Sequence, residues 1–236
     1  MTASNDRALD AVLSATGPVL LDFDGPVTFL MADGVNAQIA AAIRAALADI
    51  GVAVPADVAT SRDPFVVLRF AARHRAEALS VAEDACRGGE IRAAAVSRPT
   101  PGSREFLLAC AERARPVVMV SNNAAEAIEA YLGRYGLREL VRGIVGRPDQ
   151  RPELMKPDLT MVRSALDVVG TPANHCVFIG DSVTDAEVSQ RAGLRFIGFA
   201  KTPARGAELA DVGAEVLVED MRALADAVLR SPAWRP

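Results

Sequence analysis

The 236-residue chain contains few lysine, cysteine and aromatic residues, and it also lacks several patterns that would indicate particular classes of protein. Only 2 of the 26 basic residues are lysine. The net charge of −4 offers no basic footprint for nucleic acid or anionic membrane, so we expect neither as a partner. No apolar run approaches the ~20 residues that span a bilayer. No Gly-x-Gly-x-x-Gly motif follows an expected strand, which argues against nicotinamide binding.

The three cysteines give no indication of a disulfide framework. Cys86, Cys110 and Cys176 are far apart, odd in number and set among apolar residues. We therefore expect buried thiols in a reducing compartment. Residues 1–15 lack the basic start and hydrophobic centre of a signal peptide. Together these features predict a cytoplasmic protein.

The most informative stretch is residues 18–27, PVLLDFDGPV. It reads as a short buried strand that ends on two carboxylates, Asp22 and Asp24. Because side chains alternate along a strand, both should project to the same side, where their charges repel. Such a pair needs a cation, a shared proton or open water. Gly25 allows a turn and brings its amide close to a ligand.

From there to residue 98 the pattern is helical. Apolar residues recur at helical spacing, and Asp63-Pro64 is an N-cap followed by proline at the first helical position. The expected helices span residues 35–50, 64–74, 76–87 and 90–96, the third ending at Gly88-Gly89, and residues 52–62 are expected to form a loop. We predict an all-helical domain over residues 28–98.

From Pro99 onward, strands and helices alternate. The expected strands are residues 116–120, 143–145, 176–179, 195–199 and 214–218. The expected helices are residues 102–113, 124–135, one that starts at Lys156-Pro157-Asp158, 185–192 and 221–229; residues 231–236 should be a loose tail. This alternation requires a parallel sheet covered on both faces. We predict an α/β protein with a Rossmann-like, three-layer core of residues 1–27 and 99–236, into which the helical domain is inserted.

Polar residues follow three of these strands at the carboxyl edge of the sheet, where ligands bind in open α/β folds. They are Asp22 and Asp24, Ser121 and Asn122, and Asp181 and Asp185, with Lys156 before a helix between the last two groups. Each alone can be a solvated turn or a helix cap. Their joint occurrence at strand ends, in this order, indicates a site.

The order Asp-Phe-Asp-Gly, Val-Ser-Asn, Met-Lys-Pro and Gly-Asp-Ser-Val-Thr-Asp resembles the four motifs of the haloacid dehalogenase-like hydrolase superfamily. The match covers Pro18 to about Thr202, with the helical block where members carry a helical cap. Pro26 departs from the family, which usually has threonine or valine there. Since proline lacks an amide hydrogen, that position cannot donate to a phosphate.

The resemblance implies phosphoryl transfer through an aspartyl-phosphate on Asp22. Asp24 would protonate the leaving oxygen and then activate water, and Lys156 would balance charge. The implied phosphate contacts are Ser121, Asn122, Lys156 and the amides of Phe23, Asp24 and Gly25. The implied Mg²⁺ ligands are the Asp22 carboxylate, the Asp24 carbonyl and Asp181. Asp185 would orient a ligand or the lysine rather than bind the metal.

These roles favour a Mg²⁺-dependent phosphatase that acts on a small phosphorylated metabolite, similar to phosphoglycolate phosphatases. A phosphosugar mutase shares the same core and stays open, as does a catalytically silent fold used for binding. Dehalogenases of the superfamily generally lack an acid equivalent to Asp24. Phosphonate-cleaving members use a cap lysine, and residues 28–100 contain none.

The expected cap also carries basic residues. Arg62, Arg69 and Arg73 are candidates to line up and grip an anionic group on the substrate. The simpler alternative is a solvated basic face in an arginine-rich protein.

Overall fold

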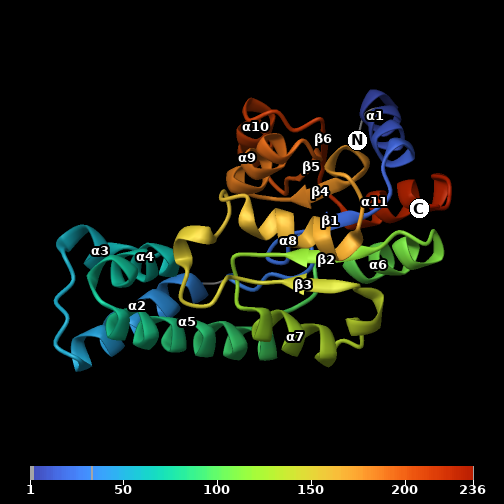
Figure 1. The fold of residues 1–236 in the computed structure, drawn as a ribbon. Helices are drawn as coiled ribbons and strands as arrows, with labels where there is room; N and C mark the ends of the chain where they lie inside the picture. The colour runs from blue at the N-terminus through green and yellow to red at the C-terminus, as the bar shows by residue number, and fades with distance from the viewer. Residues whose placement is uncertain (1–2, 33, 236) are drawn as a thin grey trace.

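The computed structural model describes residues 3–32 and 34–235, and within them six parallel strands form one sheet (Figure 1). The strands are β1 (Val19–Leu21), β2 (Val117–Val120), β3 (Gly143–Val145), β4 (Val177–Gly180), β5 (Arg195–Phe199) and β6 (Val216–Val218), in the order β3-β2-β1-β4-β5-β6. Leu20 on β1 pairs with Val118 on β2 and with Phe178 on β4. The first strand of the chain therefore lies at the centre, between the strands that precede the other two polar groups.

Helices account for most of the remaining chain. They are α1 (Ala3–Ala15), α2 (Val35–Asp49), α3 (Ala56–Thr60), α4 (Pro64–His74), α5 (Ala76–Val96), α6 (Ser103–Glu112), α7 (Ala125–Arg134), α8 (Thr160–Val169), α9 (Val183–Ala192), α10 (Pro203–Asp211) and α11 (Met221–Arg230), with short 3-10 turns at Arg138–Leu140, Pro152–Leu154 and Ala173–His175. No helix in the described ranges is both long and apolar enough to cross a membrane.

The sheet separates two hydrophobic clusters. Val19 and Leu21 point to the face covered by α1, α6, α7 and α11, whereas Leu20 points to the face covered by α8, α9 and α10. This alternation is the period of two that strand geometry imposes. The predicted three-layer α/β/α core is confirmed.

The inserted helical segment, residues 35–96 with helices α2 to α5, has a third hydrophobic cluster of its own. Its last helix, α5, also reaches the core: Ala93 and Ala94 join the cluster of the sheet, and α5 packs against α7 (Figure 1). Because one helix belongs to both clusters, the domain boundary at residue 98 stays a prediction.

The chain leaves the core and returns to it at neighbouring points. Phe29 N donates to Arg98 O at 3.3 Å, and Thr100 N donates to Val27 O at 3.0 Å. The Thr28 hydroxyl also donates to Arg98 O, at 2.9 Å. The two connections to the helical segment are thus hydrogen-bonded to each other.

Several expected boundaries are wrong. The helix expected to end at Gly88-Gly89 continues to Val96, because Gly89 is buried against Ile39 on α2 and the close approach of the two helices favours a residue without a side chain. Part of the expected loop forms α3, and α10 was not expected. These two elements are short, and packing decides them more than local pattern does.

Two further expectations fail. The helix expected to start at Lys156-Pro157-Asp158 begins instead at Thr160, whose amide donates to Asp158 Oδ1 at 2.8 Å. The expected loose tail is instead attached to the core at Ser231, which is buried, and at Trp234. Trp234 covers Gly17, where a Cβ atom would lie 2.1 Å from the indole ring, and Trp234 N donates to the Arg113 carbonyl.

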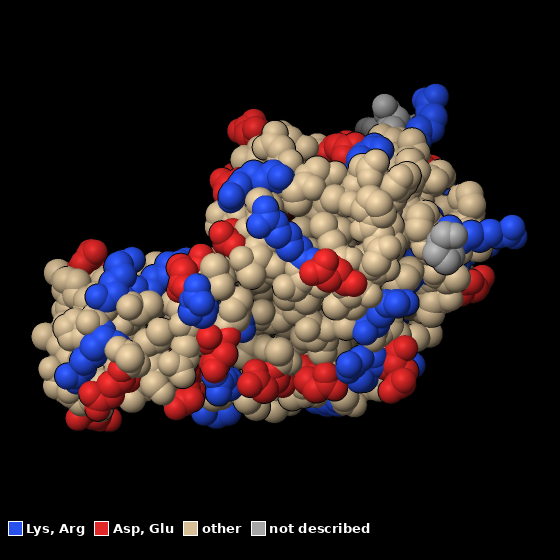
Figure 2. All heavy atoms as spheres, viewed as in Figure 1, with Lys and Arg blue, Asp and Glu red and all other residues tan. Residues whose placement is uncertain are grey.

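Charges on the face seen in Figure 2 are mixed. Acidic and basic side chains alternate along its lower edge, over α5 and α7, and do not gather into one basic patch. This face therefore lacks the continuous positive surface that a nucleic-acid phosphate backbone requires.

Candidate active site

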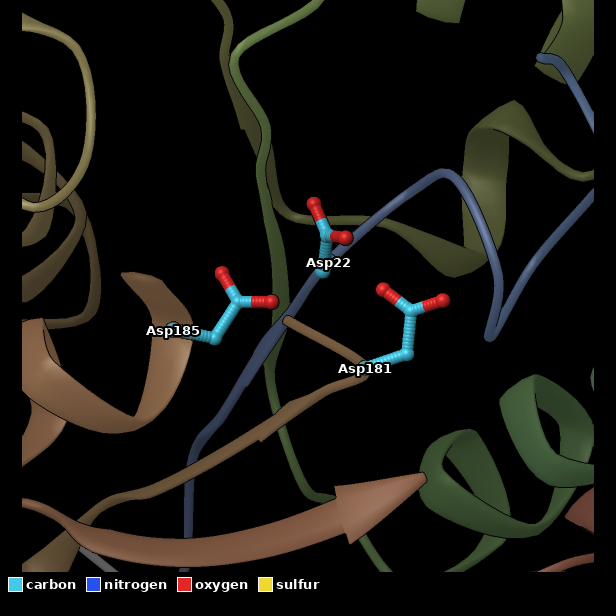
Figure 3. A group of neighbouring side chains, drawn as sticks. All are labelled: Asp22, Asp181 and Asp185. Carbon is cyan, nitrogen blue, oxygen red and sulfur yellow. The ribbon is translucent and has the colours of Figure 1, made fainter. Parts of the chain in front are cut away.

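Three carboxylates converge at the carboxyl edge of the sheet (Figure 3). Asp22 follows β1, Asp181 follows β4, and Asp185 lies in the first turn of α9. One oxygen from each lies within 4.8 Å of the others. Since β1 and β4 are hydrogen-bonded neighbours, their ends bring together residues that are far apart in the sequence.

Lys156 supplies the positive charge at this cluster. Its ammonium donates to Asp22 Oδ1 at 2.9 Å, to Asp185 Oδ1 at 2.6 Å and to the Val120 carbonyl at 2.8 Å. Burial by itself disfavours the cation, but the carboxylates of Asp185 and Asp22 outweigh it and hold the pKa of Lys156 above its usual range. The lysine therefore stays charged at neutral pH.

Asp185 is already satisfied by protein donors. Its Oδ1 accepts from Lys156, and its Oδ2 accepts from the Ser182 hydroxyl at 2.6 Å and the Ser182 amide at 3.1 Å. The second of these contacts completes a capping box at the start of α9. Asp185 thus orients the lysine, although its carboxylate is close enough to the other two to share an ion with them.

The other carboxylates at this edge of the sheet, those of Asp22, Asp24 and Asp181, have raised pKa values. Burial raises the pKa of Asp22, and Lys156 only partly offsets this; burial and the nearby Asp22 charge raise the pKa of Asp181. Burial also raises the pKa of Asp24 to about 6, against the opposing effect of the Met31 and Leu30 amides that donate to its Oδ1. The single charge of Lys156 is smaller than the summed charge of these carboxylates, so a bound divalent cation would reduce the repulsion between them.

Gly25 allows the loop after β1 to lie against Asp181, because it has no side chain. It has φ = 107°, and a Cβ atom there would lie 2.3 Å from Asp181 Oδ2. Its amide donates to the Thr28 carbonyl at 2.7 Å. The Gly25 amide, expected to bind phosphate, is therefore engaged within its own loop, and we do not assign it that role.

The loop after β2 carries Ser121 and Asn122. The Asn122 side chain pairs with the backbone of Lys156: its Oδ1 accepts from Lys156 N at 2.8 Å and its Nδ2 donates to Lys156 O at 3.2 Å. The buried Ser121 hydroxyl donates to Asn123 Oδ1 at 3.1 Å. Asn122 therefore fixes the segment that presents the lysine, a contact not expected from the sequence.

A cavity of about 440 Å³ opens onto these groups, a size within the ~300–1,000 Å³ of small-molecule sites. The core contributes six of the expected residues to its lining: Asp22, Asp24, Ser121, Asn122, Lys156 and Asp181. The inserted helical segment and the loop before it contribute Met31, Asn36, Asp63, Phe65 and Arg69, and α10 contributes Arg205.

Of the three expected arginines, Arg69 lines the cavity. Arg62 lies in the exposed loop before α4, and Arg73 lies one turn beyond Arg69 on an exposed part of the helix. The structure therefore brings one of the three candidate arginines, Arg69, to the cavity, and a substrate contact of Arg62 or Arg73 stays a prediction. Asn36 and Arg205 were missed because neither lies in a motif, and only the three-dimensional fold brings them to the cavity.

Two buried residues behind the loop were also missed. Glu90 on α5 accepts from Asn123 and from the Ala124 amide, and Arg147, just after β3, binds Glu90. Nothing in the local sequence distinguishes them from the many other charged residues of the chain.

Comparison with known proteins agrees with this geometry. The curated phosphoglycolate phosphatase of Pseudomonas savastanoi pv. phaseolicola is 25% identical over 124 residues, which are 52% of this chain and 45% of that protein. The chain thus matches about half the length of this relative.

Solved structures share the fold over nearly the whole chain. CbbY from Rhodobacter sphaeroides in complex with phosphate has a TM-score of 0.67 at 18% identity, covering 88% of this chain and 95% of that one. A haloacid dehalogenase family hydrolase from Deinococcus radiodurans R1, with bound phosphate and sodium, has a TM-score of 0.60 at 25% identity, covering 93% and 100%. The family model for haloacid dehalogenase-like hydrolases matches residues 19–193, and the chain belongs to this family.

Proposed function

We propose that this protein is a Mg²⁺-dependent phosphatase that hydrolyses a small phosphorylated metabolite through a phosphorylated Asp22. The observation that carries the proposal is the buried contact of Lys156 with Asp22, beside Asp24 and Asp181 at the mouth of a cavity. The curated relatives named phosphoglycolate phosphatase support it, as does the phosphate found with two structural neighbours.

Asp22 is the nucleophile in this proposal. A carboxylate is a weak nucleophile, so the phosphoryl group it attacks must first lose much of its negative charge. Lys156, whose ammonium lies 2.9 Å from Asp22 Oδ1, would provide part of that neutralisation. The backbone amides of Phe23, Asp24 and Asn122 would bind the phosphate oxygens, and so would the Ser121 hydroxyl once its hydrogen turns away from Asn123 Oδ1.

Asp24 is the proton carrier. With a pKa raised to about 6, it is present in both protonated and ionised forms near neutral pH. It can therefore protonate the leaving oxygen and then, as the carboxylate, take a proton from the attacking water. The Leu30 and Met31 amides hold one of its oxygens and fix its orientation.

The residues present fit Mg²⁺, which prefers oxygen ligands and bridges carboxylates to phosphate. Asp22 and Asp181 both line the cavity with raised pKa values, so an adjacent cation would relieve their repulsion. They would hold the ion together with the Asp24 carbonyl. When bound, Mg²⁺ would withdraw charge from the phosphoryl oxygens.

The cavity lining supports a class of substrate. The phosphate group would lie at the carboxylates, and the rest of the molecule would face the inserted helical segment, where Arg69 and Asn36 offer donors. A small metabolite with a carboxylate or a second phosphate fits this lining, and phosphoglycolate is such a molecule.

The experiment is a panel of phosphorylated metabolites, phosphoglycolate included, assayed for released phosphate with Mg²⁺, with excess chelator, and with Asp22→Asn. Release that requires Mg²⁺ and is lost in Asp22→Asn is expected. Full activity in chelator would exclude the metal, and a near wild-type rate for Asp22→Asn would exclude the covalent route. Isomerisation of a sugar phosphate without release would indicate a mutase.

A further inference from the structure

Glu90, on the last helix of the inserted helical segment, accepts hydrogen bonds from two residues of the loop after β2. Its carboxylate is fully buried. Oε1 accepts from Asn123 Nδ2 at 3.0 Å, and Oε2 accepts from the Ala124 amide at 3.0 Å, just before α7. A buried carboxylate with two such contacts fixes both of its partners, because leaving either donor unpaired would be costly.

Arg147 closes the arrangement from the core. Its guanidinium binds Glu90 in a bidentate manner, with Nη1 donating to Oε1 at 2.9 Å and Nη2 donating to Oε2 at 3.1 Å. Nη1 also donates to Asn122 O at 2.9 Å, and Arg147 N donates to Asn123 O at 2.8 Å. Three consecutive residues of the loop, 122 to 124, are therefore held by one buried ion pair.

The arrangement reaches the Ser121 hydroxyl through the Asn123 side chain. Asn123 donates to Glu90 through its Nδ2 and accepts from the Ser121 hydroxyl through its Oδ1, at 3.1 Å. Ser121 lines the cavity beside Asp22 and Lys156. Glu90 thus sets the orientation of the Asn123 amide, which in turn holds the Ser121 hydroxyl.

We propose that Glu90 is a positioning residue that acts through Asn123 to hold Ser121 Oγ at the cavity, from where its one hydrogen can turn from Asn123 Oδ1 to a phosphate oxygen. This inference rests on the proposed phosphatase function. It means that the affinity of the core for phosphate depends on a residue that the inserted helical segment supplies.

Glu83 provides a matched control. It lies two turns earlier on α5, is also buried, and binds the same guanidinium, with Arg147 Nη2 3.0 Å from its Oε2. Among the described residues its carboxylate hydrogen-bonds to Arg147 and not to the loop after β2. Glu83 and Glu90 thus both bind Arg147, but only Glu90 also contacts Asn123, the residue that is hydrogen-bonded to Ser121.

The test compares Glu90→Gln with Glu83→Gln by calorimetric titration of inorganic phosphate in the presence of Mg²⁺, alongside urea denaturation. Both variants should lose stability. Glu90→Gln should raise the Kd for phosphate roughly tenfold. Its side-chain NH2 would face Asn123 Nδ2 or the Ala124 amide, both of which need an acceptor. Glu83→Gln should change that Kd by less than about twofold. Equal changes in the two variants, or none in Glu90→Gln, would overturn the proposal.

Two further variants test the path itself. Asn123→Ala keeps the Glu90–Arg147 pair but removes the link, so it should raise the Kd for phosphate as Glu90→Gln does, even if Glu90→Gln fails to fold. In a Ser121→Ala background, Glu90→Gln should raise the Kd for phosphate by a further factor of less than about two. A full additional effect there would show that Glu90 does not act through Ser121.

The outcomes separate this proposal from the proposed function. Wild-type protein that binds phosphate while the two glutamate variants behave alike would overturn the positioning role alone. Wild-type protein that neither binds phosphate nor releases it from any metabolite would overturn the phosphatase function, and this inference with it.

Discussion

Lys156 Nζ lies 2.9 Å from Asp22 Oδ1, although the two residues are 134 positions apart in the chain. Both side chains are almost completely buried, and the same ammonium also binds Asp185. The contact joins the nucleophile proposed here to its charge-balancing cation before any substrate arrives. This ion pair would contribute both to the stability of the fold and to the proposed reaction, and mutations can test the two contributions separately.

Lys156→Met should abolish measurable turnover and lower the free energy of unfolding by about 3–5 kcal/mol, because it leaves two buried carboxylates without a counterion. Adding Asp185→Asn removes one of those charges, so the double variant should recover stability but not activity. Urea denaturation and phosphate release measure the two effects. Recovery of turnover in the double variant would contradict the assigned role of the lysine.

Asp24→Asn should keep the fold, since an amide oxygen can still accept from the Leu30 and Met31 amides. It cannot deliver a proton, so the rate on an alkyl phosphate should fall by about 10²–10⁴. A p-nitrophenyl leaving group needs little protonation, and its release in a pre-steady-state burst should be affected much less. An equal loss on both substrates would exclude Asp24 as the acid.

The metal-free protein should become less stable as the pH rises from acid to neutral. Burial raises the pKa of both Asp22 and Asp181 above the ordinary 3.8. Their stabilising contribution is therefore fully present below that value and is lost as the pH rises through the raised pKa values. Mg²⁺ competes with these protons, so the rise in Tm caused by Mg²⁺ should be larger at about pH 8 than at about pH 5.

Thermal unfolding with and without Mg²⁺ measures this effect. Asp181→Asn is the control: it removes one ligand and one titrating group, so both the pH dependence and the Mg²⁺ shift should shrink. A Mg²⁺ shift that is the same at both pH values would argue against an ion at these carboxylates.

Arg69→Ala should raise KM for a metabolite that carries a carboxylate or a second phosphate, by roughly tenfold for a lost charge-assisted contact. Hydrolysis of p-nitrophenyl phosphate, which needs only the core, should change little. Arg73→Ala is the matched control, because it removes an arginine from the same helix outside the cavity. The assignment fails if the two variants behave alike.

Gly88→Ala and Gly89→Ala, neighbours on α5, should have opposite effects on stability. A Cβ at Gly88 meets only the end of the Arg92 side chain, at 3.3 Å, so alanine should stabilise the helix by about 0.5–1 kcal/mol. A Cβ at Gly89 would lie 2.7 Å from Ile39 Cγ1, and overpacking should destabilise the protein by about 1–3 kcal/mol. Chemical denaturation measures both, and stabilisation by Gly89→Ala would mean that α2 and α5 pack less closely.

The convergence of Asp22, Ser121 and Asp181 could be predicted because each of these residues follows a strand, whereas Lys156 was assigned to the site through its motif. Parallel strands place their carboxyl ends at one edge, so polar residues at three strand ends must meet there. The same reasoning gives the three-layer core, since strands buried on both faces read as continuous apolar runs.

What depends on packing between distant segments could not be predicted. Glu90 and Arg147 are 57 residues apart and carry no local signature. Gly88-Gly89 looks like a helix stop until Ile39 is known to lie against Gly89. Arg62, Arg69 and Arg73 look equivalent in the sequence, and only the direction in which α4 approaches the core selects Arg69.

The hydrogen bond from Thr100 N to Val27 O brings the two ends of the insertion together. A segment with adjoining ends can be exchanged for another of different length with little effect on the sheet, because closing the connection costs nearly the same free energy. Glu83 and Glu90 leave with the segment, however, and Arg147 stays behind in the core. A chimera made by cutting at residues 27 and 100 would therefore carry a buried cation without its counterions, and a viable exchange of specificity between relatives must transfer or replace all three residues together.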